Sequence, residues 1–158
     1  MGQPRPEWLE IARVSAADNG VPLPGLLALI NRESDWNQYA YNSESGAMGL
    51  GQFMGPTAAE WGVAPWSPAS AIDGAARYLH WLRTQLGEWP RALAAYNWGI
   101  GNVQNAGSGW RDAMPTQTRN YVAALSPSFA AGELAPSGPQ GVALLLLLAL
   151  GVGLSRLK

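Results

Sequence analysis

Residues 24–37 read PGLLALINRESDWN, and the apolar residues in this stretch recur with the period of an α-helix. Leu26, Leu29 and Ile30 precede a glutamate at helical spacing, so a helix here carries all four side chains on one face. This glutamate, Glu33, also lies near the C-terminus of the helix, where the helix dipole is negative. Burial and the dipole both disfavour a negative charge, so we expect the pKa of Glu33 to lie above its ordinary value.

A raised pKa gives Glu33 a possible catalytic role, because a carboxylic acid that stays protonated near neutral pH is what general acid catalysis requires. The alternative is a structural glutamate that pairs with Arg32 or another cation at the helix end, and the residue pattern does not separate the two. Asp35 and Glu44 are near in the sequence, but neither can be assigned as a second catalytic carboxylate.

The composition limits the other kinds of chemistry. The chain has no cysteine and one histidine, His80, which has no second ligand at metal spacing. Thiol nucleophiles, disulfides and cysteine-rich zinc sites are therefore excluded, and a Ser-His-Asp triad is excluded unless His80 has an unusual role. The net charge of −1 and the scattered Lys and Arg residues argue against nucleic-acid binding. Eight tryptophans and five tyrosines fit either core packing, which their number favours, or a surface that stacks on sugar rings.

Helical periodicity continues outside this stretch and predicts a mainly α fold for residues 1–127, which we take as one domain. The expected helices cover residues 7–17, 24–33, 68–86, 89–97 and 117–125. The glycine-rich stretch 46–57 (GAMGLGQFMGPT) predicts an irregular loop or a small hairpin. It lacks the ending of a phosphate-binding loop, so we interpret it as a backbone that approaches a ligand, with Gln52 supplying a donor and an acceptor. An ordinary flexible loop is the alternative.

The C-terminal part of the sequence differs in composition. Residues 128–140 are rich in small residues with proline and glycine, and they predict a linker. Residues 141–157 begin with the apolar run GVALLLLLALGVGL, and Arg156 and Lys158 follow it. We interpret this run as a membrane anchor with its basic end on the cytoplasmic side, and a hydrophobic helix docked on the domain or on a partner is the alternative. The first ten residues do not resemble a signal peptide.

Four short motifs occur in order along the predicted domain. They are residues 31–37 (NRESDWN), 43–57 (SESGAMGLGQFMGPT), 93–103 (LAAYNWGIGNV) and 115–122 (PTQTRNYV). Together these motifs resemble those of the soluble lytic transglycosylase family, and the resemblance covers residues 11–125. It implies a helical catalytic domain with a goose-type lysozyme-like fold, which we therefore expect.

The resemblance also implies a role for each residue that matches a family motif. Glu33 corresponds to the catalytic general acid and base, and Tyr121 to a tyrosine close to it. Other matching residues correspond to positions that touch the substrate or form the floor of the cleft. The implied substrate-binding residues are Ser43, Gln52, Met54, Tyr96, Asn97 and Tyr121. Neither a metal nor a cofactor is implied.

Three residues depart from the family pattern. Gln117 stands where the family usually has a glutamate with a structural or substrate-supporting role, so the role implied for Glu33 is unaffected. Gly51 replaces the usual methionine of its motif. Trp98 replaces a small residue, and its ring would reshape a subsite or add a face that stacks on a sugar.

The activity implied by the resemblance is cleavage of the β-1,4 bond between N-acetylmuramic acid and N-acetylglucosamine in peptidoglycan, with formation of a 1,6-anhydro sugar. A lysozyme-type hydrolase with the same site and an inactive, membrane-anchored peptidoglycan-binding module are the alternatives. A small wall-cleaving domain with a membrane tail and no visible signal peptide is typical of bacteriophage enzymes for lysis or for penetration of the host. We therefore expect a domain that faces peptidoglycan from a host or virion membrane.

Overall fold

The structure of the chain is a computed structural model that describes residues 2–133. Its regular elements are helical, and the prediction of a mainly α fold is confirmed. In chain order the elements are α1 (Pro6–Asn19), α2 (Leu23–Ser34), α3 (Gly55–Glu60), α4 (Pro68–Leu86), α5 (Trp89–Trp98), α6 (Ile100–Asn105), the 3₁₀ turn η1 (Gly107–Gly109), α7 (Trp110–Ala113) and α8 (Thr116–Glu133).

Local sequence signals set the ends of the long helices. Proline stands in the first turn of α1, α2, α4 and α5, where the helix does not need the N–H group that proline lacks. Gly20 after α1 and Gly87 after α4 adopt positive φ angles of 61° and 85°, the left-handed conformation that commonly ends a helix. Because these signals are local, the predicted helices 7–17 and 68–86 agree with the observed ones to within two residues at each end.

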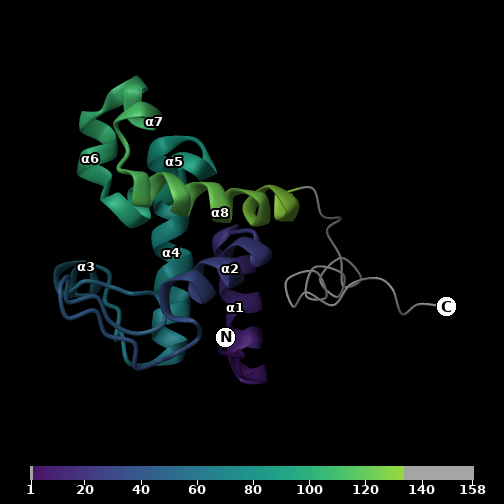
Figure 1. Cartoon of the computed structure of the whole chain (residues 1–158). Coiled ribbons are helices and arrows are strands. Elements are labelled where there is room, and N and C mark those ends of the chain that lie inside the picture. The colour runs from purple at the N-terminus through teal and green to yellow at the C-terminus, as the bar shows by residue number, and fades with distance from the viewer. Residues whose placement is uncertain (1, 134–158) are drawn as a thin grey trace.

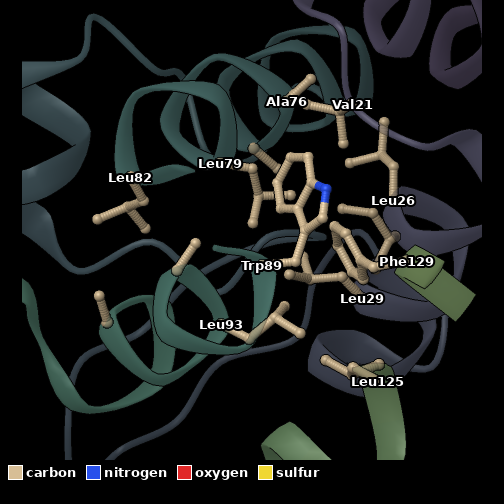
Figure 2. Packing of buried hydrophobic residues seen from close by; sticks show 14 of the residues in the cluster. Val21, Leu26, Leu29, Ala76, Leu79, Leu82, Trp89, Leu93, Leu125 and Phe129 are labelled. Atoms are coloured by element: carbon tan, nitrogen blue, oxygen red, sulfur yellow. The ribbon is translucent and has the colours of Figure 1, made fainter. Parts of the chain in front are cut away.

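The helices pack around α4, which contacts α1 and α5, while α8 crosses over α2 and α5 (Figure 1). The core between them is apolar, and in it the indole of Trp89 meets the ring of Phe129 with their centroids 4.9 Å apart (Figure 2). Leu26 and Leu29 of α2 and Leu79 of α4 are fully buried in the same core. The apolar face that the sequence predicted for α2 is therefore part of the core.

The last helix is longer than the sequence predicted. We expected a helix over residues 117–125 and then a linker, but α8 also includes Pro127 and residues 128–133. Phe129 is fully buried against Gly25 of α2, where an added Cβ atom would lie 2.7 Å from the phenyl ring. Pro127 is exposed, so water can bond to the carbonyl group that its missing N–H leaves free. Tertiary packing, which composition does not report, keeps this segment helical.

The predicted C-terminal features fall mostly outside the structure. The rest of the linker, 134–140, and the predicted hydrophobic helix, 141–157, lie outside the described residues. Within residues 2–133, no helix combines the length and the apolar character that crossing a membrane requires. The membrane anchor therefore stays a prediction from the sequence.

The segment between α2 and α4 is irregular, as expected, and forms a lobe around α3 on one side of α4 (Figure 1). Met48 and Phe53 exchange two backbone hydrogen bonds of 3.0 Å, and Met48 also bridges to Tyr41, so the segment contains a very small hairpin. The helix α3 was not predicted, and neither were α6 and α7, because helices this short show no full period of apolar residues. Val63 packs on Gly74 and ties the lobe to α4.

Candidate active site

Glu33 lies in the last turn of α2, and its side chain is half-buried. The hydroxyl of Tyr121, on α8, donates a hydrogen bond to its Oε1 atom. The other carboxyl oxygen makes no hydrogen bond to a residue in the range 2–133. Arg32 is exposed and forms no ion pair with Glu33 in this part of the chain, so the geometry does not match a structural pair between the two.

Burial raises the pKa of Glu33 from 4.5 to about 7. The hydrogen bond from Tyr121 and the positive charge of Arg32 lower this pKa, but by less than burial raises it. No second carboxylate is among the groups that shift it. The expected rise of the pKa is confirmed, and both protonation states of the carboxyl group are populated near neutral pH.

Two tyrosines from different helices feel the charge of this carboxyl group. Tyr121 is buried, and burial followed by the charge of Glu33 raises the pKa of its hydroxyl well above the ordinary value. The same two causes, in the same order, raise the pKa of Tyr96, on α5. The hydroxyl of Tyr96 donates to the backbone carbonyl of Gly51 over 2.8 Å. Both hydroxyls therefore stay neutral hydrogen-bond donors at any pH near neutrality.

The side chain of Gln52 forms hydrogen bonds within the loop that contains Gly51. Its side-chain nitrogen donates to the backbone carbonyls of Ala40 and Gly49, over 3.2 and 3.0 Å. Its side-chain oxygen has no hydrogen-bond partner among the described residues. We expected this side chain to offer a ligand both a donor and an acceptor. Its nitrogen already donates to two backbone carbonyls, so only its oxygen can bond to a ligand without breaking these bonds.

Gly51, which stands in place of the usual methionine of its motif, has a spatial reason to lack a side chain. A Cβ atom here would lie 2.7 Å from the ring of Phe53 and 3.2 Å from the hydroxyl of Tyr96. The first of these distances is shorter than real side-chain contacts, so the Phe53 ring occupies the room that a side chain at position 51 would need. The glycine at position 51, which departs from the family motif, therefore leaves room for the ring of Phe53.

The other residues implied by the resemblance make no hydrogen bond to Glu33. Asn97 accepts a hydrogen bond of 2.9 Å from the hydroxyl of the buried Thr118, which joins α5 to α8 beside Tyr96. Ser43 and Met54 are exposed in the lobe and make no hydrogen bond to Glu33 or its tyrosines. The side chains of Gln117 and Trp98 are respectively exposed and half-buried. Thr118 was not singled out in the sequence, although it lies within the fourth motif.

The backbone next to the carboxyl group is strained. Among residues 2–133, positive φ angles occur outside glycine at Asp35, Trp36 and Gln52, with values of 49°, 60° and 49°. Two of these directly follow the helix that carries Glu33. Trp36 is held there because its ring is buried and stacks on Trp8 of α1, with centroids 6.4 Å apart. Such conformations persist only where the surrounding packing enforces them, and they are frequent at functional sites.

Comparison with known proteins identifies the family. The family model of the transglycosylase SLT domain matches residues 10–116. The chain belongs to the transglycosylase SLT domain family. The matched region of the SLT domain contains Glu33, Gln52 and Tyr96, and it ends shortly before Tyr121.

Solved structures of lytic transglycosylases share the fold of this SLT domain. An inactive mutant of the lytic transglycosylase Slt from Pseudomonas aeruginosa matches with a TM-score of 0.63 and 24% identity, over 77% of this chain and 23% of that protein. The 70-kDa soluble lytic transglycosylase from Escherichia coli matches with a TM-score of 0.64 and 23% identity, over 78% and 23%. A complex of the 70-kDa soluble lytic transglycosylase with bulgecin A matches with a TM-score of 0.66. The chain therefore spans only 23% of the length of these proteins, and the predicted transglycosylase-type helical fold is confirmed.

Proposed function

We propose that this SLT domain is a peptidoglycan lytic transglycosylase that uses Glu33 as its general acid and base. The observation that carries the proposal is a half-buried carboxyl group with a pKa of about 7 that accepts a hydrogen bond from Tyr121. Membership of the family and the shared fold support the class of reaction. The proposed substrate is the β-1,4-linked strand of N-acetylmuramic acid and N-acetylglucosamine.

In the first step, protonated Glu33 gives its proton to the bridging oxygen as the glycosidic bond breaks. Positive charge then develops at C1 of the muramic acid, and a second enzyme carboxylate is the usual partner for this charge. No such carboxylate is among the groups that act on Glu33. The resemblance to the family implies that the acetamido oxygen of the substrate itself stabilises this charge.

In the second step, the ionised Glu33 takes the proton of the C6 hydroxyl of the same muramic acid. The C6 oxygen forms a bond to C1, and the proton of the C6 hydroxyl replaces the one that the carboxyl group gave to the leaving sugar in the first step. The attacking group is already part of the sugar, so this step is intramolecular and has a high effective concentration. The product is a 1,6-anhydro sugar, and the carboxyl group ends the cycle in its starting state.

The hydroxyl of Tyr121 has a distinct part in this cycle. It is a neutral donor to Oε1 and stabilises the carboxylate that the first step produces. The second oxygen of Glu33 has no partner among residues 2–133 and is the one we assign to proton transfer with the sugar. In the relative from Pseudomonas aeruginosa, a glutamate-to-glutamine mutant is inactive, which supports a reaction that depends on one glutamate.

The direct test is the substitution Glu33→Gln. The amide keeps the size of the side chain but has no transferable proton, so we expect release of muropeptides from purified sacculi to fall by at least about 100-fold. Circular dichroism should show an unchanged fold. Glu44→Gln is the matched control, because Glu44 is an exposed acid of the lobe, and its activity should stay within about twofold of wild type. Near-normal activity of Glu33→Gln would rule out the assignment.

Mass analysis of the products separates the proposal from its alternatives. A transglycosylase releases muropeptides that are lighter by one water than those of a hydrolase, because the anhydro ring replaces the attack of water. Products that carry the mass of the added water identify a lysozyme-type hydrolase. Binding to sacculi without any release of fragments identifies an inactive binding module.

The location of the protein is a separate proposal that rests on the sequence alone. We propose that residues 141–157 anchor the protein in a membrane with its domain facing peptidoglycan. Extraction of membranes with alkaline carbonate tests this, since an anchored protein stays in the pellet and a peripheral one is released. The expected role in bacteriophage lysis or penetration stays a prediction. Detection in purified virions would favour penetration, and detection only in late-infected cell membranes would favour lysis.

A further inference from the structure

The exposed aromatic side chains of residues 2–133 are confined to the lobe between α2 and α4. They are Tyr39, Tyr41 and Trp66, with exposed fractions of 70%, 61% and 44%. The other tyrosine, tryptophan and phenylalanine side chains in this part of the chain are buried or half-buried. None of the three exposed rings stacks on another ring or meets a cation within the described residues.

The backbones that carry these three residues meet at one point. The carbonyl of Ala40, which lies between the two tyrosines, accepts a hydrogen bond of 2.9 Å from the N–H of Gly49. Gly49 in turn lies so close to the residue before Trp66 that an added Cβ atom would be 1.9 Å from the carbonyl oxygen of Pro65. We call Tyr39, Tyr41 and Trp66 the aromatic platform. The three residues belong to the segment between α2 and α4, whose backbone forms the lobe around α3 in Figure 1.

The platform is carried on a backbone that hydrogen bonds fix. The N–H of Tyr39 donates to the side chain of Asn37 over 3.0 Å, and the N–H of Ala40 donates to the carbonyl of Asn37 over 3.0 Å. Tyr41 forms the backbone bridge to Met48. A fixed backbone that holds largely exposed aromatic rings in water, with no ring or cation stacked on them within the described residues, is the arrangement expected of a binding surface.

Hydrogen bonds join the backbone of this platform to Gln52, and the neighbouring Gly51 to Tyr96. The carbonyl of Ala40 also accepts from the side chain of Gln52, over 3.2 Å. The residue before it, Gly51, accepts from Tyr96 over 2.8 Å, and Tyr96 lies within the electrostatic reach of Glu33. The platform therefore belongs to the same hydrogen-bonded loop that contacts Tyr96.

Building on the proposed function, we propose that the aromatic platform binds sugar rings of the glycan strand several residues away from the bond that is cleaved. Tyrosine and tryptophan combine an apolar ring with a polar tip, and a sugar ring presents an apolar C–H face beside its hydroxyl groups. Residues 37–67 contain Glu44 and Glu60 but neither Lys nor Arg, and Arg77 of α4, which contacts the lobe at the carbonyl of Trp61, is paired with Asp73. The lobe therefore has no unpaired cation of its own to attract nucleic-acid phosphates or an anionic bilayer. The charge thus favours a saccharide over a membrane surface.

The test is the triple variant Tyr39→Ser, Tyr41→Ser, Trp66→Ser in the full chain. The three side chains that are replaced are exposed, so the fold should persist. Val14→Ser is the matched control, because Val14 is an apolar residue of α1 that is 42% exposed. We expect kcat/KM on long glycan strands to fall about tenfold or more, while kcat/KM on the shortest cleavable fragment stays within about twofold. Replacement of both tyrosines by phenylalanine keeps the rings and should preserve most of the preference for long strands.

Binding measured without catalysis keeps this inference separate from the proposed function. The Glu33→Gln protein should sediment with long glycan strands, and adding the triple substitution should abolish this even if the wild-type enzyme proves unable to cleave them. Equal losses on long and short substrates, or no loss of strand binding, would overturn the inference. It would also be overturned if the three rings were needed for sedimentation with phosphatidylethanolamine–phosphatidylglycerol vesicles but not with glycan.

Discussion

The carboxyl group of Glu33 works under opposing influences from three sources. Burial raises its pKa, and the Tyr121 hydroxyl and the charge of Arg32 lower it, with a result of about 7. Burial keeps the tyrosine neutral, so its hydroxyl donates to the carboxylate throughout the pH range of interest. The acid form needed for bond cleavage is lost as pH rises through 7, and we expect activity to fall about tenfold per pH unit above this value.

Replacing Tyr121 by phenylalanine should shift this dependence in a defined direction. The hydrogen bond from Tyr121 lowers the pKa of Glu33, so its removal should move the alkaline fall in activity to a higher pH. The maximum rate should also drop, because the carboxylate formed during catalysis loses its donor. Profiles of kcat/KM from pH 5 to 9 measure both effects. Tyr78→Phe is the control, because the Tyr78 hydroxyl makes no hydrogen bond within residues 2–133, and a shift to lower pH in Tyr121→Phe would contradict the prediction.

The same carboxyl group should destabilise the fold at alkaline pH. Its folded pKa is raised, so the native state binds the proton more tightly, and the stabilisation is present below pH 4.5 and lost as pH rises through 7. From pH 4 to 8 this loss is about 3 kcal/mol. Glu33→Gln should therefore be about as stable as wild type at pH 4 and more stable at pH 8, as measured by urea unfolding. Equal differences in stability at the two pH values would show that ionisation is not the cause.

At the scale of helices, the contact between α2 and α8 determines whether the site is assembled. Phe129 of α8 is fully buried against Gly25 and Trp89, in the half of the helix that composition did not predict. Phe129→Ala should lower the free energy of unfolding by about 3–5 kcal/mol, because it leaves a cavity in the core. Thermal and urea unfolding measure this, with Val14→Ala as an exposed control. A loss below about 1 kcal/mol would show that this part of α8 does not support the domain.

The helices show which sequence signals suffice and which do not. The ends of α1 and α4 follow from proline in the first turn and glycine after the last, so they were predictable. The end of α8 depends on the ring of Phe129, which packs on Gly25 of α2. The small residues around Pro127 are typical of a linker, so composition does not predict a helix there. Short helices such as α3 and α6 carry too few residues to show a period. Their ends are set by contacts with the rest of the domain.

At the scale of the whole molecule, the site exists only when distant parts of the chain fold together. Glu33 and Tyr121 are 88 residues apart in the sequence. Helical spacing alone gave the apolar position of Glu33 and the direction of its pKa shift, whereas Tyr96 and Tyr121 could be placed only through the order of the family motifs. The bond from Thr118 to Asn97 and the convergence of Tyr39, Tyr41 and Trp66 depend on tertiary contacts that no local pattern encodes.

The tight fit of Gly51 against the ring of Phe53 couples these two positions. A Cβ atom at position 51 would lie 2.7 Å from that ring, so any larger residue there requires the ring to move. Substitutions at position 51 are therefore best made together with a smaller side chain at position 53.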